Sequence, residues 1–320
     1  MEKQKSVKRI QWGESSIILL NVFLFLTLTI GTETFFSYNN LYSLVYGVSI
    51  QFFAIIGFTL LLIMGELDLS VGAVYGFSGT IVGALMRFLN MNFYLAVICS
   101  IVFCGLLGLL TGFLITKLRL NSMMVTLAAM TLIQGLNSVL FNKMPASIYD
   151  SVYRKFSKYE IGGIYWTILF MFLFIVVLEI LLKKTTTLKK LYYIGYDAQT
   201  ARLYGCKVEK IKMICFSVSA MTAALGGIVA TSRITHSDIN TGAGMEFTMI
   251  TACVIGGCSM AGGRGGILKA GLGLFFLEML SNGMVIFKID PYMQQVATGV
   301  ILVLAVLFDV QINRNKIGGK

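Results

Sequence analysis

The sequence predicts an all-α integral membrane protein, a bundle of about ten transmembrane or half-membrane helices. Of its 320 residues, 57% are hydrophobic and only 13% are charged, whereas roughly a quarter of the residues of a soluble domain are charged. The mean hydropathy is +0.81. Because one membrane-spanning helix takes about 20 residues, such a bundle leaves no room for a large soluble domain. We therefore expect a multi-pass protein of the cell (inner) membrane.

Ten apolar runs follow one another along the chain, each long enough for a full or partial crossing of the bilayer. Four basic residues precede the first run and no small-residue cleavage site follows it, which indicates a retained anchor rather than a cleaved signal. The predicted helices span residues 15–34, 41–64, 70–86, 93–116, 122–141, 164–182, 213–232, 246–260, 264–286 and 292–311. We expect a single transmembrane domain over residues 1–320, with its membrane bundle at 15–311.

The distribution of basic residues predicts the orientation of this bundle. An even number of crossings returns both termini to one side, and most of the 26 Lys and Arg residues then fall on that side. The positive-inside rule places such a side in the cytoplasm. We therefore expect cytoplasmic N- and C-termini, with residues 183–212 as the longest cytoplasmic segment.

The composition argues against several kinds of site. A single histidine, and six cysteines without a CxxC pair, argue against zinc and disulfide frameworks. The chain has neither a GxxxxGK[ST] phosphate loop nor a strand–GxGxxG–helix unit, so we expect no nucleotide site, no metal site and no catalytic residue. The net charge of +11 is spread over segments beside the membrane, which favours contact with anionic lipid rather than nucleic acid.

Two glycine-rich segments interrupt the helical pattern: MGELDLSVGAVYG after the second predicted helix and VIGGCSMAGGRGGI after the eighth. Glycine at this density disfavours continuous helix, and non-helical backbone at membrane depth survives only inside protein or beside water. We expect both to be helix breaks that gate a transport path, or else tight turns in which Asp68 caps the following helix. The residues assigned to these breaks are Gly65, Glu66, Asp68, Ser70, Gly72, Gly256, Gly257, Gly262, Gly263 and Arg264.

Polar side chains on the last two predicted helices indicate a pathway through the bundle. Glu278 and Asn282 are four residues apart and therefore share one helix face. A carboxylate at that depth must face the bundle interior or a wet cavity. Gln294 and Gln295 give a similar uncharged face, and we assign all four residues to the translocation pathway. The alternative is that they join helix to helix, with Glu278 paired to Lys269.

The cytoplasmic segment contains a short predicted helix. Asp197 can cap a helix that starts at Ala198, and Gly205 can end it. A helix this short is unstable alone in water, so another surface must support it. It is either an amphipathic turn on anionic lipid or, as we expect, a docking site for another protein.

Four motifs in order resemble one known family. GELDLSVG, IGYDAQTARLYGCKVEKIK, GGCSMAGGRGGILKAGLG and DPYMQQVATGVILVLAVLFD resemble segments of the permease subunits of ribose-type ABC importers, which carry simple sugars or a furanosyl autoinducer. The similarity extends over residues 15–311. It departs at Glu66, where that family commonly has glycine, and at Glu278, where a small residue is usual. Because these two residues add negative charge, the solute is either a neutral sugar or a sugar with a cationic substituent.

The resemblance implies a pore subunit that is not an enzyme. Two such permeases, identical or sister chains, would form the pathway, and an extracytoplasmic sugar-binding protein would deliver the solute. A cytoplasmic ATP-binding subunit would drive transport and would itself hold ATP and Mg, with no cofactor in this chain. The resemblance also implies a coupling helix received by that ATPase, made of Tyr196, Asp197, Ala198, Ala201, Arg202, Leu203, Tyr204, Gly205 and Lys207.

The predicted outer loops are basic and include Arg154, Lys155 and Arg233. Acidic lobes of a binding protein would gain orientation and association rate from such a surface. We assign these three residues to binding-protein docking, with an ordinary solvated loop as the alternative.

Three other functions fit part of the sequence. One is an ABC permease for amino acids or nucleosides. Another is an ion-coupled secondary transporter that uses Glu66, Asp68 and Glu278 as proton sites. The third is an intramembrane serine protease, because GFSG matches G-x-S-G and His236 would be the base for Ser78. Since His236 falls in a predicted outer loop, this third function lacks its structural context.

Overall fold

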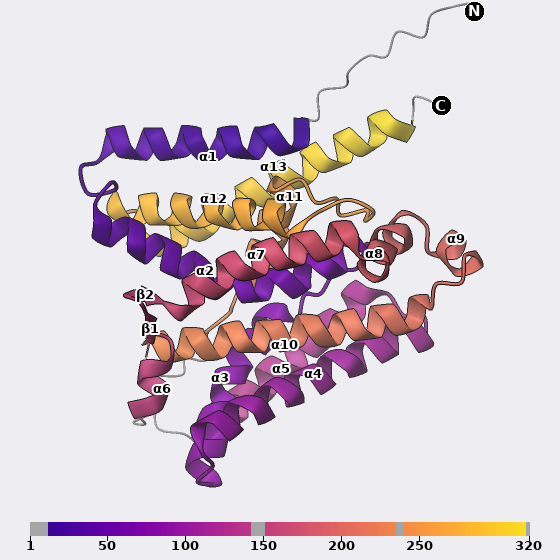
Figure 1. Cartoon of the computed structure of the whole chain (residues 1–320), viewed down its shortest axis with the longest axis horizontal. Helices are drawn as coiled ribbons and strands as arrows, with labels where there is room; N and C mark the ends of the chain where they lie inside the picture. Colours follow the sequence, from indigo (N-terminus) through magenta and orange to yellow (C-terminus); the bar gives the residue numbers. More distant parts are fainter. Residues whose placement is uncertain (1–11, 142–150, 235–239, 318–320) are drawn as a thin grey trace, which may run out of the picture.

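The structure is a computed structural model that describes residues 12–141, 151–234 and 240–317. Over these ranges it is almost entirely helical (Figure 1), which confirms the predicted all-α fold. Within these described residues, eight helices are long and apolar enough to cross a membrane, and two shorter apolar helices accompany them. The protein is therefore a multi-pass membrane protein with the ten predicted apolar helices.

In chain order the elements are α1 (Trp12–Gly31), α2 (Tyr38–Ile63), α3 (Val71–Phe88), α4 (Phe93–Lys117), α5 (Ser122–Phe141), α6 (Ser151–Phe156), β1 (Glu160–Ile161), β2 (Ile164–Tyr165), α7 (Trp166–Lys184), α8 (Thr186–Tyr196), α9 (Ala198–Leu203), α10 (Val208–Ile234), α11 (Met245–Ile255), α12 (Ile267–Ile286) and α13 (Pro291–Ile317).

The structure corrects some predicted boundaries. The helix expected over 213–232 is α10, which starts five residues earlier and ends two residues later. The helix expected over 246–260 ends at Ile255 because Gly257 takes a φ of +92°, a conformation that glycine adopts without steric cost. The antiparallel hairpin β1–β2 and the helix α8 were not predicted at all.

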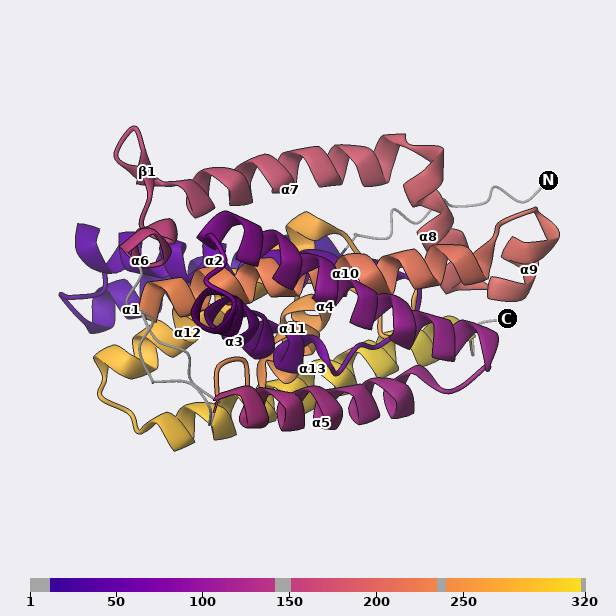
Figure 2. The same cartoon turned by 90° about the horizontal axis from the view of Figure 1, so that it is seen from below.

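Two helices form the centre of the bundle. In α2, 89% of the membrane-spanning window is buried by the rest of the protein. The helix α10 packs on α2, α3 and α4, and Figure 2 shows α2 and α10 between α7 on one side and α5 on the other. The close approach depends on a glycine: a Cβ added to Gly57 of α2 would lie 2.3 Å from Ser219 Cα of α10.

The two ends of the bundle carry different elements (Figure 1). The helix α9 protrudes at one end, and α13 ends on the same side of the bundle. The hairpin β1–β2 and the helix α6 lie at the opposite end. The membrane side on which each end of the described chain lies stays a prediction from the basic residues.

Candidate functional site

The two predicted helix breaks exist, and they meet at the end of the bundle that carries α9. The first break (residues 64–70) joins α2 to α3, and the second (residues 256–266) joins α11 to α12. Gly263 N donates to Ile63 O at 2.8 Å. A backbone hydrogen bond therefore joins the second break to the end of α2, about 200 residues earlier in the chain.

The last turn of α8 packs directly on this meeting point. A Cβ added to Gly195 would lie 1.9 Å from Ile63 O and 2.5 Å from Gly263 N, so no larger residue fits there without moving backbone. The Tyr192 hydroxyl donates to Gly265 O at 3.0 Å. Burial raises the pKa of Tyr192 to about 12, so this hydroxyl keeps its proton at neutral pH. We call the contact of α8 with both breaks the break junction.

The helix α9 follows α8 after one residue, which confirms the short helix predicted there. Asp197 accepts hydrogen bonds from Gln199 N, at 2.8 Å, and from the Thr200 hydroxyl. These bonds lower the pKa of the Asp197 carboxyl. Gly205, with a φ of +78°, allows the chain to turn away after the helix. The capping signals in the sequence therefore match the local structure.

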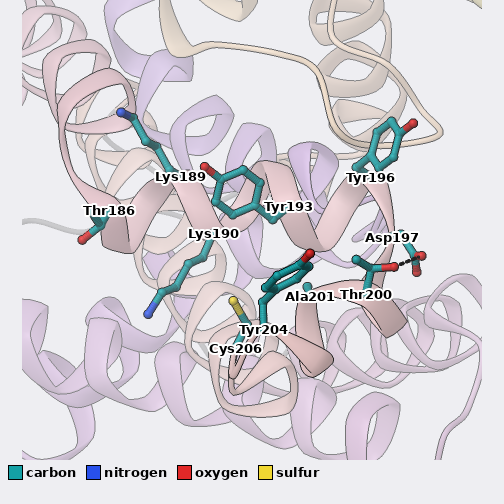
Figure 3. A pocket seen from close by; sticks show the side chains of 10 residues that line it. All are labelled: Thr186, Lys189, Lys190, Tyr193, Tyr196, Asp197, Thr200, Ala201, Tyr204 and Cys206. Carbon is teal, nitrogen blue, oxygen red and sulfur yellow. Dashed lines mark hydrogen bonds between the residues drawn. The ribbon is translucent and has the colours of Figure 1, made fainter.

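The surface of α8 and α9 combines exposed large side chains with a groove. The side chains of Tyr196, Leu203 and Tyr204 are between 85% and 87% exposed. A groove of about 510 Å³ lies beside Tyr196 and Tyr204. Figure 3 shows the side chains that line it, among them tyrosines and the two lysines Lys189 and Lys190. Aromatic side chains are enriched where proteins bind proteins. This groove is the candidate docking surface of the described chain.

Charged side chains also link α9 to the first break, by way of the start of α10. Arg202 Nη2 of α9 lies 2.7 Å from Glu209 Oε1, and Lys212, one turn further along α10, pairs with Glu66. The side chains of Lys212 and Glu66 are only 18% and 11% exposed. Glu66 therefore has a cationic partner within the chain.

Asp68 lies in the first break, where it was assigned, and the residue at the N-cap of α3 is Ser70 rather than Asp68. It accepts hydrogen bonds from Ser70 N at 3.0 Å and from the Ser70 hydroxyl. Its other oxygen accepts from Ser219 Oγ of α10 at 3.2 Å. The residue is 3% exposed. Asp68 thus fixes the residue that precedes Val71, the first residue of α3, and ties the break to α10.

The remaining predicted break residues occupy different positions. Gly72 lies inside α3, and Gly256 is the C-cap of α11. Gly65, Gly257, Gly262 and Gly263 all take positive φ angles. The carbonyl of Arg264 accepts a hydrogen bond from Ser259 N at 3.1 Å, which closes the tip of the second break.

A cavity of about 920 Å³ lies between α2, α3, α11 and α13. Gln294 and Gln295 are on its wall, as predicted for a pathway, and Gln51 of α2 is there too. Glu278 is placed behind this wall, where it accepts a hydrogen bond from Gln51 Nε2. Lys269, nine residues earlier on α12, is about 14 Å of helix rise away. The alternative pairing of Glu278 with Lys269 is therefore not found, and Gln51 is the partner instead.

Asn282 takes the other role left open for it, that of joining helices. It exchanges two hydrogen bonds with Asn40 of α2, at 3.0 Å and 2.9 Å. Glu278 and Asn282 therefore share the helix α12 but bond to different residues of α2.

Two polar residues of the bundle were missed as membrane-interior groups. Arg233 was expected in a loop, but it lies half-buried in the last turn of α10 with its guanidinium carbon 4.7 Å from the centre of the Tyr46 ring. Glu246 begins α11 at 2% exposure, and its Oε2 has no hydrogen-bond partner in the described part of the chain. An acidic residue between apolar neighbours was the available signal.

The predicted docking residues Arg154 and Lys155 lie in α6, with exposed side chains, at the end of the bundle opposite α9. The protease alternative gains no support from the placement of Ser78. Its hydroxyl is fully buried and donates to Tyr75 O and Ala224 O at 2.8 Å and 2.9 Å. His236, its expected partner, lies outside the described residues.

A bundle of membrane helices with two joined breaks, an open cavity between its helices and a protruding short helix is typical of membrane permeases. The family described as "Branched-chain amino acid transport system / permease component" matches residues 39–306. The chain belongs to this family of permease components.

Relatives with transport names extend over nearly the whole chain. Ribose import permease protein RbsC of Escherichia coli (strain K12) is 29% identical over 300 residues, which cover 92% of this chain and 93% of that protein. L-arabinose transport system permease protein AraH of the same strain is 30% identical over 298 residues, covering 93% and 90%. Autoinducer 2 import system permease protein LsrC of Photorhabdus luminescens is 34% identical over 261 residues, covering 79% and 76%.

None of the solved structures matches the chain. The matched relatives confirm the resemblance to permeases of ribose-type importers that the four sequence motifs indicate.

Proposed function

We propose that this chain is the transmembrane pore subunit of an ATP-driven, binding-protein-dependent ABC importer for a sugar, a pentose, hexose or related carbohydrate. The observation that carries the proposal is the break junction, where α8 contacts the end of α2 and the second break and leads directly into the exposed α9. The names of the relatives, which refer to ribose, arabinose and autoinducer 2, support a sugar as the solute.

Transport in this proposal proceeds by alternating access. A cytoplasmic ATPase receives α9 and its flanking residues, Tyr196 to Lys207, and moves them when it closes on ATP. Because Gly195 leaves no space between α8 and the backbones of Ile63 and Gly263, a displacement of α9 is transmitted to both breaks. Rigid-body motion of the attached helices then changes which end of the cavity is open.

The proposal assigns the chemistry and the recognition of solute to partner chains. ATP and Mg are held by the ATPase, so this chain is not an enzyme and carries no cofactor. A second permease, identical or a sister, completes the pathway. An extracytoplasmic sugar-binding protein docks at the end with Arg154 and Lys155. The whole of residues 1–320 acts as one permease domain, and its α9 side faces the cytoplasm.

The composition of the cavity favours a sugar over an amino acid. Its described lining contains three glutamines and two threonines but no charged side chain. Amides and hydroxyls satisfy sugar hydroxyls, whereas the ammonium and carboxylate of an amino acid would be desolvated without a partner of opposite charge. An ion-coupled mechanism is also less well supported, because Glu66 is paired with Lys212 and Asp68 is held by two serines.

Purification of the tagged chain in mild detergent tests this proposal. We expect an ATPase and a soluble binding protein to co-purify with it, and the binding protein to carry a sugar. Recovery of the folded permease with neither partner, from membranes that express the whole system, would contradict the proposal.

A further inference from the structure

The amide side chains on the cavity wall are not equally available to a solute. Gln294 is already engaged: its Oε1 accepts from Ser281 Oγ at 3.4 Å, and its Nε2 donates to Ile289 O at 3.1 Å. Gln51 stands on a different helix, α2, and lines the same cavity. Within the described residues, the structure gives the Gln51 side chain one hydrogen bond, to Glu278. The hydrogen bond to Glu278 therefore determines which atom of the Gln51 amide faces the cavity.

The chemistry of Glu278 determines which way the Gln51 amide faces. An ionised carboxylate accepts hydrogen bonds and donates none. Only the nitrogen of Gln51 can satisfy it, so Gln51 Nε2 is directed away from the cavity toward Glu278. The carbonyl oxygen, Gln51 Oε1, is then the atom that remains for a solute.

A cationic side chain, Arg233, lies on the same side of α2 as Glu278. A Cβ added to Gly47 of α2 would lie 3.4 Å from Glu278 Oε2 and 3.8 Å from Arg233 Nη1, so both charged groups flank the same point of α2. Arg233 lies over the Tyr46 ring. Arg233 and Glu278 thus bring opposite charges to the same side of α2, without a direct ion pair between them in the described structure.

We propose that Glu278 is a positioning residue that turns Gln51 into a hydrogen-bond acceptor at the cavity wall, where it selects a hydroxyl donor of the transported sugar. This inference rests on the proposed function. It narrows the class of solute to uncharged sugars that offer a hydroxyl to Gln51. It also gives a role to the carboxylate at Glu278, where the resembled family usually has a small residue.

The test uses the complete importer in proteoliposomes, with D-ribose, L-arabinose and the monodeoxy analogues of each. Uptake is measured at saturating sugar, so that the binding protein is fully loaded and the ratio of maximal rates reports the pore. The wild type is expected to carry the parent sugar about 10-fold faster than the analogue that lacks the bonded hydroxyl, because a site built to bond a hydroxyl rejects its absence.

Four variants separate positioning from structure. Gln51→Leu removes the acceptor, and Glu278→Gln removes the charge that orients it, so both should reduce the rate ratio to about one. Gln51→Glu combined with Glu278→Gln reverses the donor and acceptor but keeps a carboxylate oxygen for the cavity, so the ratio should return. Gln134→Leu, the same change at an exposed position of α5, should leave the ratio unchanged.

The outcomes distinguish this inference from the proposed function. Sugar uptake with a wild-type ratio in Glu278→Gln, or no recovery in the exchanged pair, would overturn the positioning role alone. Recovery in the exchanged pair supports it even if Glu278→Gln assembles poorly. If the wild type carries none of these sugars, the proposed sugar importer fails, and the inference fails with it.

Discussion

Glu66 shows how a residue can be assigned to a helix break from the sequence while its partner stays unknown. The sequence marks it as a carboxylate in a glycine-rich break, next to a possible pathway. The structure pairs it with Lys212 of α10, with both side chains mostly buried. No local pattern could have found this pair, because the partners are brought together only by the packing of α10 on the first break. The pair makes Glu66 part of the framework that holds the break.

Removing one member of that pair should destabilise the protein. Lys212→Ala leaves the Glu66 carboxylate largely buried without its cation, at a cost of about 1–3 kcal/mol. Glu66→Gly combined with Lys212→Ala removes both charges and should recover most of that loss. Thermal unfolding in detergent measures the cycle. Equal stability of Lys212→Ala and the wild type would show that the pair does not support the break.

The pathway residues divide in the same way. Gln294 and Gln295 were predicted from their polarity on an apolar helix, and both line the cavity. Gln51 was not singled out, because one glutamine in an apolar helix gives no sign of which neighbours it meets. The nearness of Glu278 to Arg233 likewise depends on three helices, α2, α10 and α12, and could not be predicted from either residue's own surroundings.

At the scale of elements, the hydropathy pattern was sufficient for the apolar helices but not for α8. A run of twenty apolar residues has few alternatives to helix in a bilayer, so those helices were predicted to within a few residues. The helix α8 combines lysines, threonines and tyrosines, a composition that also suits a surface loop. Its contact with the two breaks, rather than its propensity, explains its position.

Gly195→Ala tests the break junction. The added methyl group would meet Ile63 O and Gly263 N at distances no contact allows, so α8 must move away from both breaks. We expect the rate of sugar uptake per ATP hydrolysed to fall at least about 10-fold. Gly135→Ala on α5, where nothing lies within 4 Å of the added atom, is the matched control. Unchanged coupling in Gly195→Ala would show that the junction does not transmit motion.

The cap of α9 should depend on pH. Hydrogen bonds from Thr200 and the backbone lower the pKa of Asp197 in the folded protein, so its contribution is present above the ordinary carboxyl value of about 3.9. It is lost as the pH falls through the lowered value. Amide exchange in α9, expressed relative to Asp197→Asn at each pH, should lose protection only below about pH 4. A ratio independent of pH would argue against the charged cap.

At the scale of the whole molecule, we assign the two ends of the bundle to different partners, the ATPase at one end and the binding protein at the other. The α9 end carries the break junction, and the other end carries α6 with Arg154 and Lys155 exposed. The large apolar side chains of α13 remain exposed along much of its described length, including Val296, Val300 and Leu304. An unburied apolar face next to the cavity suits lipid or the second permease of the proposed pore.

Charge reversal tests the docking assignment. Arg154→Glu with Lys155→Glu should slow association of the binding protein about 10-fold at low salt and remove most of the salt dependence. Lys184→Glu, at the opposite end, serves as the control. Stopped-flow association at increasing ionic strength measures the effect. Identical salt dependence in the double variant and the wild type would remove the docking role from these residues.

The central claim is that this chain is a passive sugar pathway driven by an external ATPase through α9. Radiolabelled sugar uptake into proteoliposomes, with ATP held constant and a protonophore added, tests it most directly. The account predicts uptake that requires the ATPase, ATP and the binding protein together and that persists when the proton gradient is abolished. Uptake by the permease alone, or its collapse with the protonophore at constant ATP, would contradict the account.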